Sequence, residues 1–200
     1  MSQKEKTVKI IDDYFEIDWL NYIAKLFKHE YIWAPSNNVA PSTPGYPKSH
    51  GGQYFLGSQL YKRQNLNSIK YGANGPEFSE QFIDPFNCFV KQHEESTLNF
   101  LDQIQLNCYF KDLPSEGSYH ADNFGDPELK IMILLLSENG IYEKKWGGSF
   151  YYKDEENKEV EVPFKHGRLI CFKGGVIHKA HPFNITNVPR YSIRWSYRSY

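Results

Sequence analysis

The sequence predicts one domain with a mainly β fold and flanking helices, either a sandwich or a jelly roll. The second half of the chain holds about eight short strand-like runs separated by turn residues, which is the spacing of such folds. The chain has 200 residues, of which 40% are hydrophobic and 16% aromatic. This length and composition suit one domain with a buried core and exclude a disordered chain.

A short strand and a helix are predicted at the start of the chain. Residues 8–11 read as the strand, and the stretch after Asp12 and Asp13 has apolar residues at helical spacing. The apolar face of this helix consists of Leu20, Ile23, Ala24 and Phe27.

An irregular insert and a second helix are predicted next. Residues 34–76 are rich in Pro, Gly, Ser and Asn, which predicts an irregular segment with short strands at most. We interpret this insert as a lid or binding loop, and a disordered insert is the alternative. The second helix is expected from Phe86 to about Gln103, with His93 and Leu101 on its inner stripe.

The remainder of the chain is predicted to consist of strands. Apolar runs alternate there with turn residues such as Asn139-Gly140 and Gly174-Gly175. The predicted strands are residues 105–110, 118–121, 129–136, 149–153, 159–162, 168–172, 177–180 and 190–197.

Charge and composition limit the kinds of partner that we expect the protein to bind. The chain has 23 basic and 24 acidic residues, a net charge of −1, so we expect no nucleic-acid partner, and a nucleic-acid demethylase is disfavoured. No apolar run reaches membrane-spanning length and the first residues lack a signal-peptide core, so we expect no membrane contact and a cytoplasmic location. The three cysteines, Cys88, Cys108 and Cys171, are expected to be reduced thiols.

Two histidines and an aspartate predict a metal site. His120 and Asp122 are two apart on a predicted strand, so they point to the same side while Ala121 points away. His178, from a distant strand, supplies a second imidazole. Two imidazoles and one carboxylate can hold one face of a non-heme Fe(II) ion and leave the other positions open.

Other histidines compete for the third ligand position. His181 lies three residues after His178, and on a strand the two face opposite sides, so only one can join His120. We choose His178 because it lies closer to the glycine turn. The other four histidines are weaker candidates for a metal ligand. His29 is expected to cap a helix or be exposed, His50 to lie in the insert, His93 to lie in the core and His166 to lie in a turn.

Arg190 and Ser192 predict an anion site beside the metal. They share one face of the last predicted strand, and a guanidinium next to a hydroxyl can bind a carboxylate through charge-assisted hydrogen bonds. A surface strand with ordinary ion pairs is the alternative. We favour the anion site because burying an arginine inside a barrel is unfavourable unless an anion pairs with its charge.

From Asn107 to the C-terminus the chain resembles the 2-oxoglutarate- and Fe(II)-dependent oxygenases of the prolyl 4-hydroxylase type. Residues 8–15 also resemble the first strand of that family, whereas residues 30–85 match none of its motifs. The matching segments are Cys108-Tyr109, His120-Ala121-Asp122-Asn123, Trp146-Gly147-Gly148-Ser149-Phe150, residues 167–172, His178, and Arg190-Tyr191-Ser192-Ile193 with Trp195.

The resemblance implies a double-stranded β-helix, a cupin-like jelly roll, with the site at its open end. It implies that His120, Asp122 and His178 bind Fe(II) and that Arg190 holds the distal carboxylate of 2-oxoglutarate. Tyr109 and Ser192 would lie near this cosubstrate. The chain departs from some family members in residues 131–136, which lack a tyrosine that touches the cosubstrate there.

The implied reaction is a dioxygenase reaction, in which Fe(II), 2-oxoglutarate and O2 hydroxylate an unactivated C–H bond, with ascorbate as a candidate reductant. The intact Asp122 favours hydroxylation over halogenation, because the family's halogenating relatives lack this carboxylate. The substrate stays open between a prolyl residue in a peptide or protein and a free amino acid or other small molecule. A non-catalytic jelly-roll binding module, with zinc or simple packing at the histidines, is the alternative of a different class.

Overall fold

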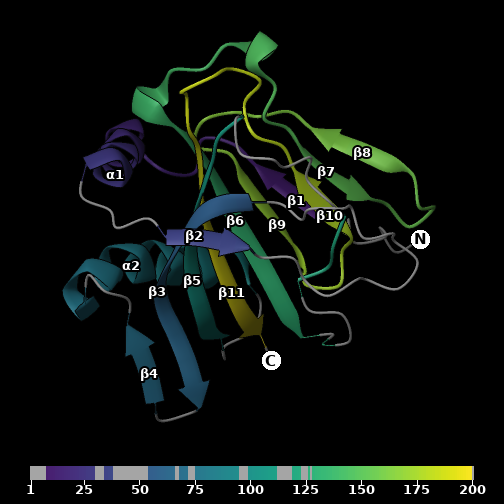
Figure 1. The fold of residues 1–200 in the computed structure, drawn as a ribbon. Helices are drawn as coiled ribbons and strands as arrows, with labels where there is room; N and C mark the ends of the chain where they lie inside the picture. The colour runs from purple at the N-terminus through teal and green to yellow at the C-terminus, as the bar shows by residue number, and fades with distance from the viewer. Residues whose placement is uncertain are drawn as a thin grey trace.

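In the part of the chain that the structure describes, the fold consists of two antiparallel β-sheets and two helices that pack on the larger sheet (Figure 1). The computed structural model describes residues 8–29, 34–37, 54–65, 68–71, 75–94, 99–111, 119–122, 126 and 128–199. The helices are α1 (Ile17–His29) and α2 (Gly75–His93), and two 3-10 turns cover Glu138–Gly140 and Lys144–Trp146. The strands are β1 (Val8–Ile11), β2 (Ala34–Asn37), β3 (Tyr54–Asn65), β4 (Ser68–Tyr71), β5 (Asn99–Tyr109), β6 (Leu129–Ser137), β7 (Phe150–Lys153), β8 (Glu159–Val162), β9 (Leu169–Lys173), β10 (His178–Ala180) and β11 (Arg190–Ser199).

The strand order brings together segments that are far apart in the sequence. The larger sheet runs β1-β9-β6-β11-β5-β3-β2 with β4 paired to β3, and the smaller sheet runs β10-β7-β8. The last strand, β11, therefore lies between β5 and β6, and its register places Arg190 opposite Tyr109 and Arg194 opposite Gln105. The predicted mainly β fold with flanking helices is confirmed.

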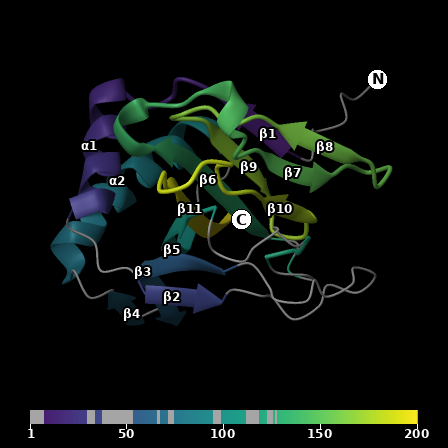
Figure 2. The same cartoon turned by 45° about the horizontal axis from the view of Figure 1, so that its top comes forward.

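The two faces of the larger sheet have different roles, because successive residues of a strand point to opposite sides. On β11, Tyr191, Ile193 and Trp195 are buried in the core shared with the helices, whereas Arg190 and Ser192 line a pocket on the other face. A second core fills the space toward the smaller sheet. Figures 1 and 2 show the helices on one side of the larger sheet and β7, β8 and β10 on the other.

The helices anchor the larger sheet from behind. The predicted apolar face of α1 is confirmed, since all four of its members are at most 3% exposed. Leu20, Ile23 and Phe27 share a core with Phe82 and Phe86 of α2. The buried indole of Trp195 donates a hydrogen bond from Nε1 to the carbonyl oxygen of Phe82, at 2.8 Å, which ties β11 to α2 directly behind the pocket.

The predicted second helix is wrong at both ends. The helix begins at Gly75 and ends at His93, and the chain from Asn99 onward forms β5. Leu101 is buried as expected, but in the sheet, where β5 exchanges backbone hydrogen bonds with β3 and β11. His93 is exposed rather than in the core, although its ring lies against Phe89 at 4.8 Å between centroids.

The expected irregular insert is also partly wrong. Residues 54–65 form the twelve-residue strand β3, which continues the larger sheet beside β5. Residues 38–53 lie outside the described residues, so the lid remains a prediction. The strand expected at residues 118–121 is not formed as predicted. Of residues 119–122, which the structure describes, only His120 pairs, through a single β-bridge to His178. The strands predicted from residue 129 onward match β6 to β11 within two residues at each end.

No helix in the described ranges is both long and apolar enough to span a membrane.

Candidate active site

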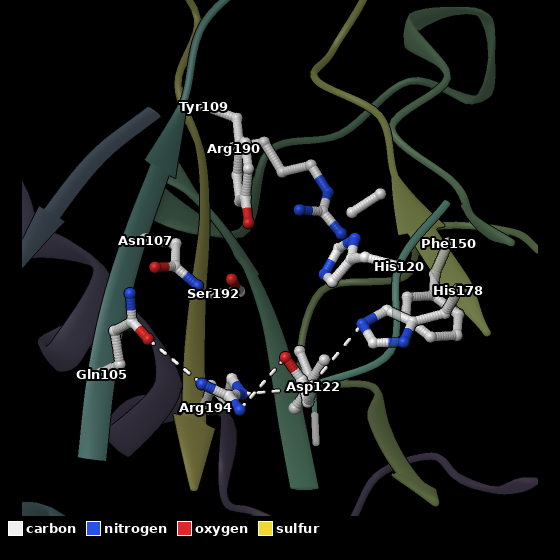
Figure 3. Close-up of a pocket in the computed structure, with 12 residues that line it drawn as sticks. Gln105, Asn107, Tyr109, His120, Asp122, Phe150, His178, Arg190, Ser192 and Arg194 are labelled. Carbon is white, nitrogen blue, oxygen red and sulfur yellow. Dashed lines mark hydrogen bonds and ion pairs between the residues drawn. The ribbon is translucent and has the colours of Figure 1, made fainter. Parts of the chain in front are cut away.

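Three potential metal ligands from two distant parts of the chain meet at the edge of a pocket between the two sheets. One ligand atom from each of His120, Asp122 and His178 can be chosen so that all lie within 4.8 Å of one another. The two imidazole rings are 4.5 Å apart between centroids. Figure 3 shows the three side chains along one wall of the pocket. The set has the composition and spacing that a single metal ion requires.

Backbone pairing places the ligands without a long strand at His120. The backbone amides of His120 and His178 each donate to the other's carbonyl oxygen at 2.9 Å, and the amide of Asp122 donates to the carbonyl of Gly174 at 3.1 Å. Ala121 is buried. A short, doubly anchored segment thus sets His120 and Asp122 beside β10, as the predicted strand was expected to do.

His178 is held in the state that a ligand requires. Its Nδ1–H donates to the carbonyl oxygen of Val176 at 2.9 Å in the neutral tautomer, which leaves the lone pair of Nε2 on the side of Asp122. The rings of Phe150 and Phe172 pack against the imidazole at 5.3 and 4.8 Å between centroids. Burial, with a smaller contribution from His120, lowers the pKa of His178 to about 4, so the ring is neutral near pH 7.

Asp122 is ionised because of a neighbouring arginine. Burial alone would raise the pKa of this carboxyl, but Arg194 and the two histidines outweigh burial and keep the pKa below its ordinary value. Arg194 donates from Nε to Oδ2 at 3.2 Å and lies with Nη2 3.1 Å from Oδ1. The two side chains are 13% and 11% exposed, so their interaction is only weakly screened by solvent.

Arg190 is a buried cation that lines the same pocket. It is 1% exposed, and its Nε donates to the carbonyl oxygen of Gly148 at 2.9 Å while its guanidinium lies 5.2 Å from the centre of the Tyr109 ring. Its Nη1 is buried and hydrogen-bonds to no atom of the described residues. Burial lowers the pKa of Arg190 to about 10. A buried guanidinium with an unused donor fits an anion that enters the pocket.

Gly148 is required for this arrangement. Its φ is +79°, and a Cβ at this position would lie 2.5 Å from the ring of Phe183. A side chain here would therefore strain the backbone and displace the carbonyl group that holds Arg190.

Two strands supply a polar wall that the sequence analysis recognised only in part. Tyr109, Arg190 and Ser192 were predicted site residues, and all three line the pocket. Gln105, Asn107 and Arg194 line it as well and were missed as site residues. The signal was present in β5, where Gln105, Asn107 and Tyr109 alternate with Ile104, Leu106 and Cys108. The first three face the pocket and the second three face the core.

The competing histidines lie elsewhere. His181 is not in the group of potential ligands, and its ring packs on Tyr151 at 5.0 Å between centroids. His166 accepts a hydrogen bond from the backbone amide of Ser137 at 3.1 Å. His50 lies outside the described residues, and His29 is the last residue of α1.

Comparison with known proteins agrees with this geometry at the level of fold. No protein-family model matches the chain, and no curated protein matches it by sequence. Solved structures do match. A 2OG-Fe(II) oxygenase family oxidoreductase from Burkholderia pseudomallei is similar with a TM-score of 0.69 and 15% identity, covering 96% of this chain and 85% of that one. The chain has the fold of the 2-oxoglutarate- and Fe(II)-dependent oxygenases.

Two further solved structures with this fold have different names, and one of them has bound ligands. A prolyl-4-hydroxylase from Pseudomonas putida has a TM-score of 0.61 and 13% identity, covering 98% of this chain and 94% of that one. HygX from Streptomyces hygroscopicus, solved with nickel, 2-oxoglutarate and hygromycin B bound, has a TM-score of 0.59 and 12% identity, covering 97% and 83%. The jelly roll expected from the sequence is thereby confirmed.

Proposed function

We propose that this protein is a 2-oxoglutarate- and Fe(II)-dependent dioxygenase that hydroxylates an unactivated C–H bond. The observation that carries the proposal is the pairing of two features in one pocket. The pocket is lined by a group of two histidines and one aspartate, and by a buried arginine whose Nη1 hydrogen-bonds to no described residue. A metal ion and a dicarboxylate bridging the two would use both features.

The metal ligands in this proposal are His120, Asp122 and His178. Two neutral imidazoles and one carboxylate are the donor set that non-heme Fe(II) prefers, and they leave adjacent coordination positions open. A structural zinc site, the alternative considered from the sequence, is normally closed by four protein ligands. The described residues offer three here, which favours a reactive metal over a structural one.

Arg190 would anchor the distal carboxylate of 2-oxoglutarate. Its guanidinium faces the pocket with Nη1 unused, while Gly148 holds Nε. Tyr109 lies opposite Arg190 in the register of β5 and β11, and Ser192 lies two residues after Arg190 on β11. Both line the same pocket, so their hydroxyl groups are the proposed additional contacts.

The bound iron would supply the oxidising chemistry, with O2 and 2-oxoglutarate as co-reactants and succinate and CO2 as by-products. The chain's own residues bind and orient. His178 is fixed by Val176 and two phenyl rings, Asp122 by Arg194, and the apolar side chains of Ile133 and Phe150 border the metal side of the pocket. Ascorbate is a candidate reductant for keeping the iron ferrous.

The substrate is proposed to be either a prolyl residue in a peptide or protein, or a free amino acid or other small molecule. The presence of a prolyl-4-hydroxylase and of the hygromycin-bound HygX among structures of the same fold supports both classes equally. A cytoplasmic location and the absence of a nucleic-acid partner remain predictions from composition.

The test is anaerobic loading with Fe(II) and 2-oxoglutarate, followed by exposure to oxygen with a panel of proline-containing peptides and free amino acids. We expect succinate to form and one component to gain the mass of one oxygen atom, as read by mass spectrometry. Asp122→Ala should abolish substrate-coupled turnover. Full succinate production by this variant, or no affinity of the wild-type protein for 2-oxoglutarate, would favour the binding-module alternative.

A further inference from the structure

Two arginines lie four residues apart on β11, and both line the pocket. They differ in how they are paired. Arg190 has no carboxylate partner among the described residues and an unused Nη1, whereas the guanidinium of Arg194 is occupied by the carboxylate of Asp122 and by the side-chain oxygen of Gln105. The proposed function uses Arg190 to hold the cosubstrate and assigns Arg194 only a contact with Asp122.

We propose that Arg194 is a positioning residue that restricts Asp122 to binding the metal through a single oxygen. This inference rests on the proposed metal site and assigns a role within it to a residue that is neither a proposed metal ligand nor a proposed contact of 2-oxoglutarate. It follows from the way in which the guanidinium meets the carboxylate, from what holds the guanidinium in place, and from the number of open positions that the reaction needs.

The guanidinium contacts both carboxylate oxygens of Asp122. Nε donates to Oδ2 at 3.2 Å, and Nη2 lies 3.1 Å from Oδ1. A fork of this kind occupies the side of the carboxylate between its two oxygens. A metal ion chelated by both oxygens would need the same side. Oδ2 also lies 3.8 Å from Nε2 of His178, so this oxygen is directed at the other ligands.

Arg194 is itself held in place. Its Nη1 donates to Oε1 of Gln105 at 3.2 Å, and Gln105 is its direct partner in the register of β11 and β5. Figure 3 shows the resulting chain of contacts from Gln105 through Arg194 and Asp122 to His178, along the end of the pocket opposite Arg190. The planar guanidinium is thus fixed on one edge by the sheet and presents the other edge to the ligand.

The coordination mode matters because the open positions are all used. If one atom from each of the three side chains held the ion, three positions would stay open for the co-reactants. A chelating aspartate would occupy one of these. A lysine at position 194 would keep the charge but not the planar fork, because an ammonium is a point charge on a flexible stem.

Arg198 provides a matched control. It lies four residues further along β11, and it pairs with Asp126 through Nε at 3.2 Å and Nη2 at 3.1 Å, and with Asp102. Neither aspartate belongs to the group of potential metal ligands. Replacing Arg198, which is 33% exposed against 13% for Arg194, therefore removes arginine–aspartate ion pairs from the same strand without removing a contact to a potential metal ligand.

The experiment measures Mn(II) binding by electron paramagnetic resonance, and the visible absorption of the Co(II) protein, for the wild type and for Arg194→Gln, Arg194→Lys, Arg198→Gln and His178→Ala. Loss of a side chain that orients a metal ligand typically weakens metal binding by about 10- to 100-fold. We expect Arg194→Gln to weaken Mn(II) binding by about tenfold or more, with an altered Co(II) spectrum. Arg194→Lys should be intermediate in affinity but should share the altered spectrum, because the fork is lost in both. Arg198→Gln should stay within about twofold of the wild type in affinity and keep its spectrum.

The outcomes separate this inference from the proposed function. If the wild type does not bind Mn(II), or His178→Ala binds it equally well, the metal site itself is wrong. If the wild type binds and His178→Ala does not, but Arg194→Gln retains wild-type affinity and spectrum, only the role of Arg194 is refuted. An equal loss in Arg194→Gln and Arg198→Gln would likewise refute it, since a general loss of stability would then explain both. Arg194→Lys covers the case in which Arg194→Gln fails to fold.

Discussion

Replacing Arg190 with methionine tests the anion site directly. The side chain is 1% exposed, its Nη1 hydrogen-bonds to no described residue, and burial lowers its pKa from 12.5 to about 10. That shift corresponds to roughly 3 kcal/mol of unfavourable burial in the ligand-free protein. Methionine removes this cost. It also removes the hydrogen bond to the carbonyl oxygen of Gly148, and leaving this buried carbonyl unsatisfied costs about 1–3 kcal/mol. The two contributions oppose each other, so the free energy of unfolding without ligand should change by less than about 2 kcal/mol.

The affinity for 2-oxoglutarate should respond far more strongly. Truncating one partner of a buried, hydrogen-bonded charge pair costs about 2–5 kcal/mol. With about 1.4 kcal/mol per factor of ten, we expect the affinity of Arg190→Met for 2-oxoglutarate to fall by roughly 100-fold. Urea unfolding gives the stability without ligand, and the rise in melting temperature of the Mn(II) protein with added 2-oxoglutarate gives the affinity.

The control is Arg168→Met, because Arg168 is paired with Asp12 through Nε–Oδ1 at 2.7 Å and Nη2–Oδ2 at 2.8 Å and does not line the pocket. This variant should lose about 1 kcal/mol of stability at most, since the pair is partly exposed, and should bind 2-oxoglutarate normally. The reasoning is refuted if Arg190→Met keeps wild-type affinity. It is also refuted if this variant loses about 4 kcal/mol without ligand, which is the behaviour of a broken buried ion pair.

Three further predictions concern the stability of the fold. Gly148→Ala should lower the free energy of unfolding in urea by about 2 kcal/mol or more and weaken 2-oxoglutarate binding, because the added Cβ would lie 2.5 Å from Phe183. The control is Gly175→Ala, whose Cβ would meet nothing within 4 Å. Equal effects in the two variants would argue against the steric explanation. Trp195→Phe should cost about 2–4 kcal/mol by circular dichroism, through the lost bond to Phe82 and the cavity left in the core, and a loss below about 0.5 kcal/mol would contradict this. The hydrogen bond from Arg168 is the main cause that holds the pKa of Asp12 below its ordinary 3.8, so its stabilisation is present above about pH 4 and is lost as the pH falls through the folded-state pKa. Asp12→Asn should therefore flatten the acid limb of the stability curve by under about 1 kcal/mol, and an unchanged acid limb would show that this pair contributes nothing.

The errors in the sequence analysis have a common physical origin. The helix predicted over residues 86–103 continued too far because Leu101 follows at a spacing compatible with a helix, yet the same leucine is buried on β5. Periodicity alone does not distinguish the two when an apolar residue satisfies both patterns. The sheet decides, because β5 lies between β3 and β11 and uses its backbone hydrogen bonds on both edges. Likewise, residues 54–65 became a strand because β5 offered an edge for pairing.

The sequence by itself was enough to predict the side chains on which the proposed chemistry depends. Residue types and the period of two along strands selected His120, Asp122 and Arg190, because side-chain direction in a strand is a local property. The glycine turn favoured His178 over His181. The tertiary structure alone decided which side chains meet across strands. The β11–β5 register set Arg194 beside Gln105, and the segment that follows His120 brought Asp122 to that guanidinium, so that one arginine was satisfied and the other was left with an unused donor. Such pairing depends on the order and register of strands distant in the chain, which no local pattern encodes.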